Sequence, residues 1–121
     1  MTMNGDRNDL DALRDAQREF AAERDWEQFH TPKNLAAALA VEAAELLEPF
    51  QWLTAEQSAA LSPEQRAAVR EEMADVLLYL VRLADKLDVD LIAAARDKIG
   101  RNAHKYPVER SKGSARKYAS P

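Results

Sequence analysis

Two apolar stretches of this 121-residue sequence are each interrupted by a pair of acidic residues at helical spacing. Glu42 and Glu45 lie in the first stretch, and Glu72 and Asp75 lie in the second. Leucine and valine recur every three or four residues around them, so positions 42 and 72 fall where this pattern calls for an apolar side chain. A carboxylate that leaves water without a partner costs several kcal/mol. A stable fold must therefore supply both pairs with a partner.

The spacing of apolar residues predicts an all-α bundle of about four helices, and the alternation typical of strands is missing from the sequence. Thr31–Pro32 and Ser62–Pro63 each place proline after a capping hydroxyl, which marks two helix starts. We expect helices over about residues 6–25, 32–48 and 63–87 and from Asp88 or Asp90 to Lys105, with a short helical turn between residues 54 and 61. Residues 1–107 are predicted to form the domain, and residues 108–121 an irregular basic arm.

Charge is unevenly distributed along the chain, with a net −10 over residues 1–95 and +6 over residues 96–121. An acidic body repels duplex nucleic acid, so we expect no such partner. The absence of cysteine excludes disulfides, thiolate metal sites and thiol catalysis, and it fits a cytoplasmic location. The apolar runs are shorter than the 18 or so residues of a membrane span, and the polar N-terminus does not resemble a signal peptide.

The two acid pairs point to a bound cation. Four carboxylates on two packed helices repel one another unless they are protonated, paired with a basic residue or bound to a metal. Neither apolar window contains enough lysine or arginine to pair with all of them. Oxygen donors suit Mg²⁺, or alternatively Mn²⁺, better than Zn²⁺. Solvated helix faces are one alternative. A di-iron bundle is another, but it wants Glu-x-x-His motifs, and neither helix contains histidine.

The last predicted helix carries the opposite charge. Lys98, Asn102 and Lys105 fall at i, i+4 and i+7, which places them on one helix face, and Arg101 lies beside it. Such a face can bind phosphate oxygens, although a solvated basic face has the same pattern. Metal-binding acids together with phosphate-binding bases favour metal-assisted phosphate chemistry.

Ring side chains flank the joints and the acid pairs. A nucleobase stacks well on flat rings, so these residues suit a nucleotide, although ordinary core packing is the alternative. The candidate base-binding residues are Trp26, His30, Trp52 and Tyr79, with Phe29 nearby.

With these residues in place, the sequence resembles the MazG-like nucleoside triphosphate pyrophosphohydrolases, most closely the branch that contains the dCTP pyrophosphatases. The resemblance covers about residues 10–107. It rests on an ordered set of segments: Arg24–His30, Pro32–Leu35, Glu42–Glu45, Phe50–Trp52, Glu71–Leu80, Lys98–Asn102 and Lys105–Pro107.

The resemblance implies a helical homo-oligomer, usually a tetramer, that hydrolyses a nucleoside triphosphate to monophosphate and pyrophosphate with Mg²⁺. It implies Glu42, Glu45, Glu72 and Asp75 as metal ligands, with Glu45 and Glu42 as the candidates for activating the attacking water. It also implies phosphate binding by Lys98, Asn102 and Lys105, and base binding by Trp26, His30, Trp52 and Tyr79. Gln17 stands where animal members have histidine, which leaves the fine base preference open.

Other functions remain open at this point. One alternative keeps the reaction but changes the substrate to dUTP or to several nucleotides, because stacking rings do not distinguish one base from another. A second alternative is a helical module without catalysis, which binds nucleotides or a protein partner. The acid pairs separate these classes, since a pure interaction module has no use for them.

Overall fold

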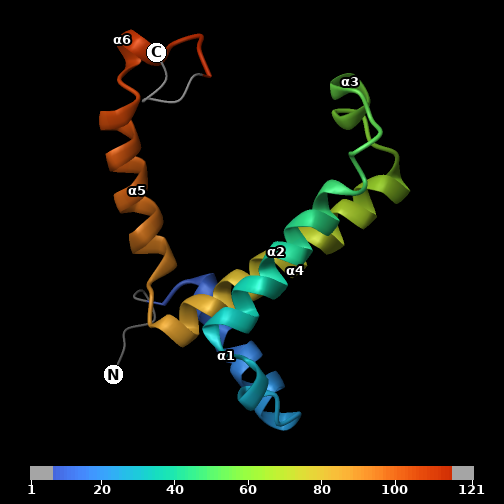
Figure 1. Cartoon of the computed structure of the whole chain (residues 1–121), viewed down its shortest axis with the longest axis vertical. Helices are drawn as coiled ribbons and strands as arrows, with labels where there is room; N and C mark the ends of the chain where they lie inside the picture. The colour runs from blue at the N-terminus through green and yellow to red at the C-terminus, as the bar shows by residue number, and fades with distance from the viewer. Residues whose placement is uncertain (1–6, 116–121) are drawn as a thin grey trace. The chain divides into compact units, whose positions relative to one another are not determined.

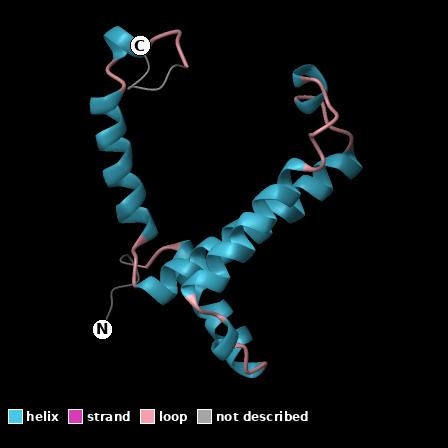
Figure 2. Ribbon diagram, in the orientation of Figure 1, coloured by secondary structure: helices cyan, strands magenta, loops and turns pink. Residues whose placement is uncertain are grey.

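A computed structural model gives the structure of the chain and describes residues 7–115. This part is all helical, as predicted, with no strand in that range (Figure 2). Its long helices are α1 (Asp9–Glu23), α2 (Pro32–Leu47), α4 (Pro63–Leu87) and α5 (Leu91–Lys105). Three short elements join or follow them: the 3₁₀ helix η2 (Glu27–Phe29), α3 (Ala55–Ser58) and α6 (Val108–Ser111).

The predicted helix starts are confirmed by their caps. The Thr31 side chain accepts a hydrogen bond from the backbone N–H of Asn34 at 3.1 Å, with Pro32 as the first helical residue. Ser62 and Gln65 form a reciprocal capping box at the start of α4. Such caps satisfy backbone donors that have no partner inside the helix.

The ends of the other helices refine the prediction. Helix α1 starts at Asp9 rather than near residue 6, because Asn8 caps it in a box with Asp11. Asp90, not Asp88, caps α5, and Asp88 ends α4 in the left-handed conformation at φ 55°. The arm that was expected to be irregular contains the short helix α6, and its residues 116–121 lie outside the described part.

The chain divides into two compact units, which meet between Asp88 and Val89. In the first unit, α2 and α4 lie side by side and run in opposite directions, joined through α3 (Figure 1). Helix α1 packs against α4 as well. The second unit contains α5 and α6. The domain boundary expected at residue 107 stays a prediction.

The core of the first unit is small. Its buried apolar residues are Ala21, Leu35, Val69, Val81 and Ala84. Leu80 and Leu87, which continue the predicted apolar stripe of α4, are 37% and 54% exposed. A single chain therefore covers only part of the apolar surface of its own helices.

No helix within residues 7–115 combines the length and the apolar character that crossing a bilayer would need.

Leu35 is the largest fully buried side chain of this core, at 2% exposure. We expect Leu35→Ala to lower the free energy of unfolding by about 2–5 kcal/mol, because the neighbouring helices cannot close the cavity. The Leu35→Met variant, which conserves volume, should cost less than about 1.5 kcal/mol. Urea denaturation followed by circular dichroism measures both. Equal losses in the two variants would contradict this view of the core.

Candidate active site

The predicted acid pairs meet where α2 and α4 pack together. Carboxylate oxygens from Glu42, Glu45 and Glu72 lie within 4.8 Å of one another, and all three side chains are half-buried. We call these three residues the acid cluster. Asp75 follows Glu72 by one helical turn and lies outside this tight group. The antiparallel packing of two helices with Glu-x-x-acid pairs explains the cluster, because residues three apart share a helix face.

The electrostatics of the acid cluster are unfavourable without a partner. The pKa of Glu42 is raised to about 7, first by its hydrogen bond with Glu45, then by burial and by the charges of Glu45, Asp75 and Glu72. Burial, followed by the charges of Glu45 and Asp75, raises the pKa of Glu72. Asp75 is thus close enough to act on both glutamates.

The cluster fits a hard divalent cation. Among the described residues, Glu42 Oε2 and Glu72 Oε2 are buried oxygens without a hydrogen-bond partner. The ion pairs found within residues 7–115 leave all three cluster residues out. Unpaired, buried, all-oxygen donors are the ligands that Mg²⁺ and Mn²⁺ prefer.

A pocket of about 190 Å³ lies between α1, the joint after it and α4. Its wall includes three of the four predicted base-binding residues, Trp26, His30 and Tyr79, and also Asp75. Asp75 lines the pocket, and its charge raises the pKa values of Glu42 and Glu72, so the pocket and the acid cluster are neighbours. We call this cavity the aromatic pocket.

The rings of the aromatic pocket pack edge to face. The Trp26 ring centroid lies 5.6 Å from that of Phe20 and 6.2 Å from that of His30. Such T-shaped pairs hold the rings in defined orientations. The joint that carries them is short and fixed at its start by Asp25, which adopts a positive φ of 55°.

The structure does not bring Trp52 into this pocket. Trp52 lies between α2 and α3 and is 86% exposed. Its role as a base-binding residue stays a prediction.

The predicted phosphate-binding residues lie in the second unit and are described on their own. Lys98, Asn102 and Lys105 occupy one face of α5, as their spacing predicts. The pKa of Lys98 lies below its ordinary value, chiefly because Lys105 approaches it, and Arg101 adds to the effect. Cations held this close together favour binding of an anion.

Several pocket residues escaped the sequence analysis, above all Arg82. This arginine lines the aromatic pocket and is only 3% exposed. Helical spacing could have found it, since position 82 follows Tyr79 by three and Asp75 by seven residues. Gln17, which the sequence analysis connected with the base preference, lines the pocket as well, and its buried Nε2 has no hydrogen-bond partner within residues 7–115.

Comparison with known proteins confirms the resemblance noted in the sequence. The sequence model of the MazG-like family matches residues 37–120. The chain therefore belongs to the MazG-like family.

The relatives narrow the comparison. The chain is 51% identical over 111 residues to dCTP pyrophosphatase 1 of Bos taurus, and 49% identical to that of Homo sapiens, with 90% of this chain aligned in each case. It spans 66% and 65% of those two proteins, about two thirds of their length. Among solved structures, a pyrophosphatase from Archaeoglobus fulgidus is 38% identical and superposes with a TM-score of 0.79, covering 88% of this chain and 98% of that one.

The raised pKa of Glu42 predicts how pH acts on folding. Its value of about 7 in the folded chain exceeds the ordinary 4.5. The folded state therefore binds more protons in this range, and its stability falls as the pH rises from 4.5 towards 7. In EDTA, we expect the Tm of the wild type to fall, relative to that of Glu42→Gln, between about pH 5 and about pH 8, because the amide does not titrate.

Thermal unfolding followed by circular dichroism measures this difference. Glu71→Gln changes an exposed acid beside the cluster and serves as the control, which should follow the wild type. Added Mg²⁺ should restore the wild-type Tm at the higher pH. Parallel curves of Tm against pH for the wild type and Glu42→Gln would contradict a raised pKa of Glu42 in the folded chain.

Proposed function

We propose that this chain hydrolyses dCTP to dCMP and pyrophosphate, with a divalent cation held by Glu42, Glu45, Glu72 and Asp75. The observation that carries the proposal is the acid cluster, with its two buried and unpaired oxygens, beside the aromatic pocket. Close similarity to proteins named dCTP pyrophosphatase 1 supports the substrate.

The charges of the site explain why a cation is needed. A triphosphate is strongly negative, and the acid cluster alone would repel it. Mg²⁺, or alternatively Mn²⁺, held by these carboxylates would neutralise phosphate oxygens and make the phosphorus easier to attack. The acid cluster would thus hold the positive ion that a negatively charged triphosphate needs in order to bind.

Water activation falls to the carboxylates of α2. In this proposal, Glu45 orients the attacking water and accepts its proton, and Glu42 is the second candidate for this role. Attack on the α phosphorus breaks the bond to the β phosphate and releases pyrophosphate.

Substrate binding is divided between two surfaces. The aromatic pocket takes the base, because Trp26 and Tyr79 offer ring faces and edges. The unpaired Nε2 of Gln17 provides a donor for an acceptor atom of the base. In this proposal, Lys98 and Lys105 offset the negative charge of the leaving pyrophosphate, and Asn102 donates a hydrogen bond to it.

We further propose that the chain assembles as a homotetramer. Met73, Leu77 and Leu80 form a stripe on α4 and are 58%, 39% and 37% exposed. Val41 and Leu47 of α2 are exposed as well. Contact with a second copy would remove this apolar surface from water and supply the core that one chain lacks. The cytoplasmic location expected from the sequence stays a prediction.

The activity predicts a defined product pattern. We expect turnover of dCTP with Mg²⁺ to give dCMP and pyrophosphate in equal amounts and to stop in EDTA. Glu45→Gln should lower kcat by about 100-fold or more, because it removes a group that acts on the transition state. Chromatography of the products from a panel of dNTPs measures both, with Glu71→Gln as the matched control.

Three outcomes of that panel would change the conclusion. Preference for dUTP, or equal rates on all nucleotides, would keep the reaction and replace the substrate. Release of free phosphate would move the attack to another phosphorus. Binding of dCTP without turnover would favour a nucleotide-binding module instead.

The assembly predicts a second measurement. We expect four chains per particle for the wild type in light scattering coupled to size exclusion. Leu77→Glu should give smaller particles, because it places a charge in the apolar stripe, and Leu77→Met should leave the assembly intact. A monomeric wild type at micromolar concentration would contradict the proposed tetramer.

A further inference from the structure

A buried arginine, Arg82, forms part of the wall of the aromatic pocket. Arg82 is 3% exposed and lies on α4 between the buried residues Val81 and Ala84. Arginine is rarely this buried unless its donors are paired. Here Nε donates to His30 Nδ1 at 3.1 Å, one terminal nitrogen donates to Asp85 at 3.3 Å, and the other donates to Glu27.

The contact with His30 has a chemical consequence. A guanidinium carries only donors and stays protonated, so the atom that it faces must accept. In a neutral imidazole one nitrogen accepts and the other carries the proton. With Nδ1 as the acceptor, the proton of His30 lies on Nε2.

We propose that Arg82 is a positioning residue that fixes the Nε2–H tautomer of His30, so that His30 presents a hydrogen-bond donor to the nucleobase in the aromatic pocket. The statement about Arg82 and His30 concerns this chain alone, and the statement about the base rests on the proposed function. The matching atom of the base is then an acceptor, which means a carbonyl oxygen or an unprotonated ring nitrogen.

The charges around His30 support a neutral ring. Arg82 and Lys86 face it from α4, and Glu27 faces it from η2. Burial, followed by the charge of Arg82, lowers the pKa of His30, and Glu27 opposes this shift. Across the pocket, Asp75 and Tyr79 are the other ionisable groups of the wall.

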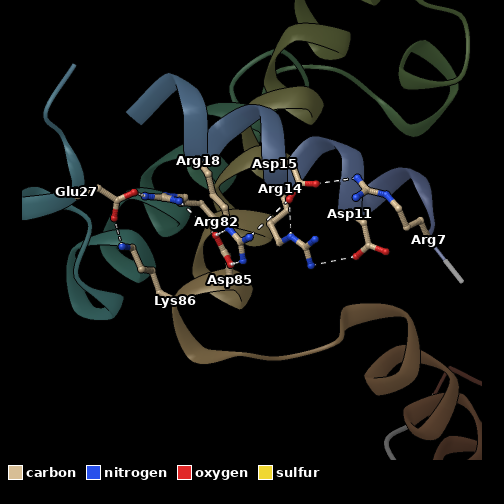
Figure 3. A network of polar contacts seen from close by, with 9 residues as sticks. All are labelled: Arg7, Asp11, Arg14, Asp15, Arg18, Glu27, Arg82, Asp85 and Lys86. Atoms are coloured by element: carbon tan, nitrogen blue, oxygen red, sulfur yellow. Dashed lines mark hydrogen bonds and ion pairs between the residues drawn. The ribbon is translucent and has the colours of Figure 1, made fainter. Parts of the chain in front are cut away.

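The guanidinium itself is held at both ends (Figure 3). Glu27 pairs with Arg82 and also with Lys86, and these two ion pairs join η2 to α4. At the other end Asp85 accepts from Arg82 and from Arg18 of α1, the latter at 2.8 Å from Nε. Together with His30, Glu27 and Asp85 thus fix the plane of Arg82, and a lysine ammonium could not make these three directed contacts at once.

The tautomer is measured directly by nitrogen NMR of protein labelled with ¹⁵N-histidine. The chain has two histidines, and a His104→Gln variant assigns the signals. We expect His30 to show an unprotonated Nδ1 and a protonated Nε2 in the free wild type near pH 8. A proton on Nδ1, or a cationic ring at neutral pH, would overturn the proposal without any variant.

Two variants test the part played by Arg82. In Arg82→Lys, we expect the signals of His30 to become an average of both tautomers, because the directed donor to Nδ1 is lost. Arg14→Lys is the matched control, because Arg14 pairs with Asp11 and Asp15 and not with His30. An Arg82→Lys protein that keeps the wild-type spectrum would show that other groups select the tautomer.

Steady-state kinetics test whether Arg82 and His30 contribute to binding of the base. We expect Arg82→Lys to raise KM for dCTP about three- to tenfold, the equivalent of one hydrogen bond, with kcat within about twofold, because the acid cluster is unchanged. An altered tautomer with an unchanged KM would overturn the role in base binding. If the wild type does not hydrolyse dCTP, the proposed function and the base contact both fail, and the NMR spectrum still decides the statement about Arg82.

Discussion

Repulsion between carboxylates is the constraint on which the rest of this structure depends. Helices α2 and α4 form the main packed pair of the first unit, yet each places a glutamate on the face that it buries against the other. Apolar contacts beside the acid cluster, such as those of Leu35 and Val69, hold the helices together despite the raised pKa values of Glu42 and Glu72. Carboxylates held this close together favour binding of a cation, and the position of the acid cluster therefore determines where a triphosphate could bind.

A second electrostatic system lies near the C-terminal end of α4, and its charges are paired within the chain. Arg82 pairs with Asp85 and Glu27, while Arg18 pairs with Asp85 and Lys86 pairs with Glu27, so that α1, η2 and α4 are tied together (Figure 3). The aromatic pocket lies between this paired network and the unpaired acid cluster. The charged residues that join α1, η2 and α4 are paired with one another, whereas Glu42 and Glu72 of the acid cluster have no basic partner among the described residues.

Much of this arrangement could be predicted from the sequence, because it depends on local rules. Helical spacing placed Glu42 and Glu72 on buried faces, and capping residues such as Ser62 marked the helix starts. The packing of α1 against α4 could not be predicted this way, because periodicity within one helix does not say which helix it meets. The partners of Arg82 could not be predicted for that reason, since Glu27 and His30 lie more than 50 residues away in the sequence.

The central claim is that the acid cluster binds a divalent cation, and a titration with Mn²⁺ followed by electron paramagnetic resonance tests it most directly. Free Mn²⁺ gives a strong signal that is lost on binding, so the measurement needs neither substrate nor turnover. The account predicts saturable binding to the wild type near pH 8, competition by Mg²⁺, and loss of that binding in Glu72→Gln but not in Glu71→Gln. Equal binding to the wild type and Glu72→Gln, or none to the wild type, would contradict it.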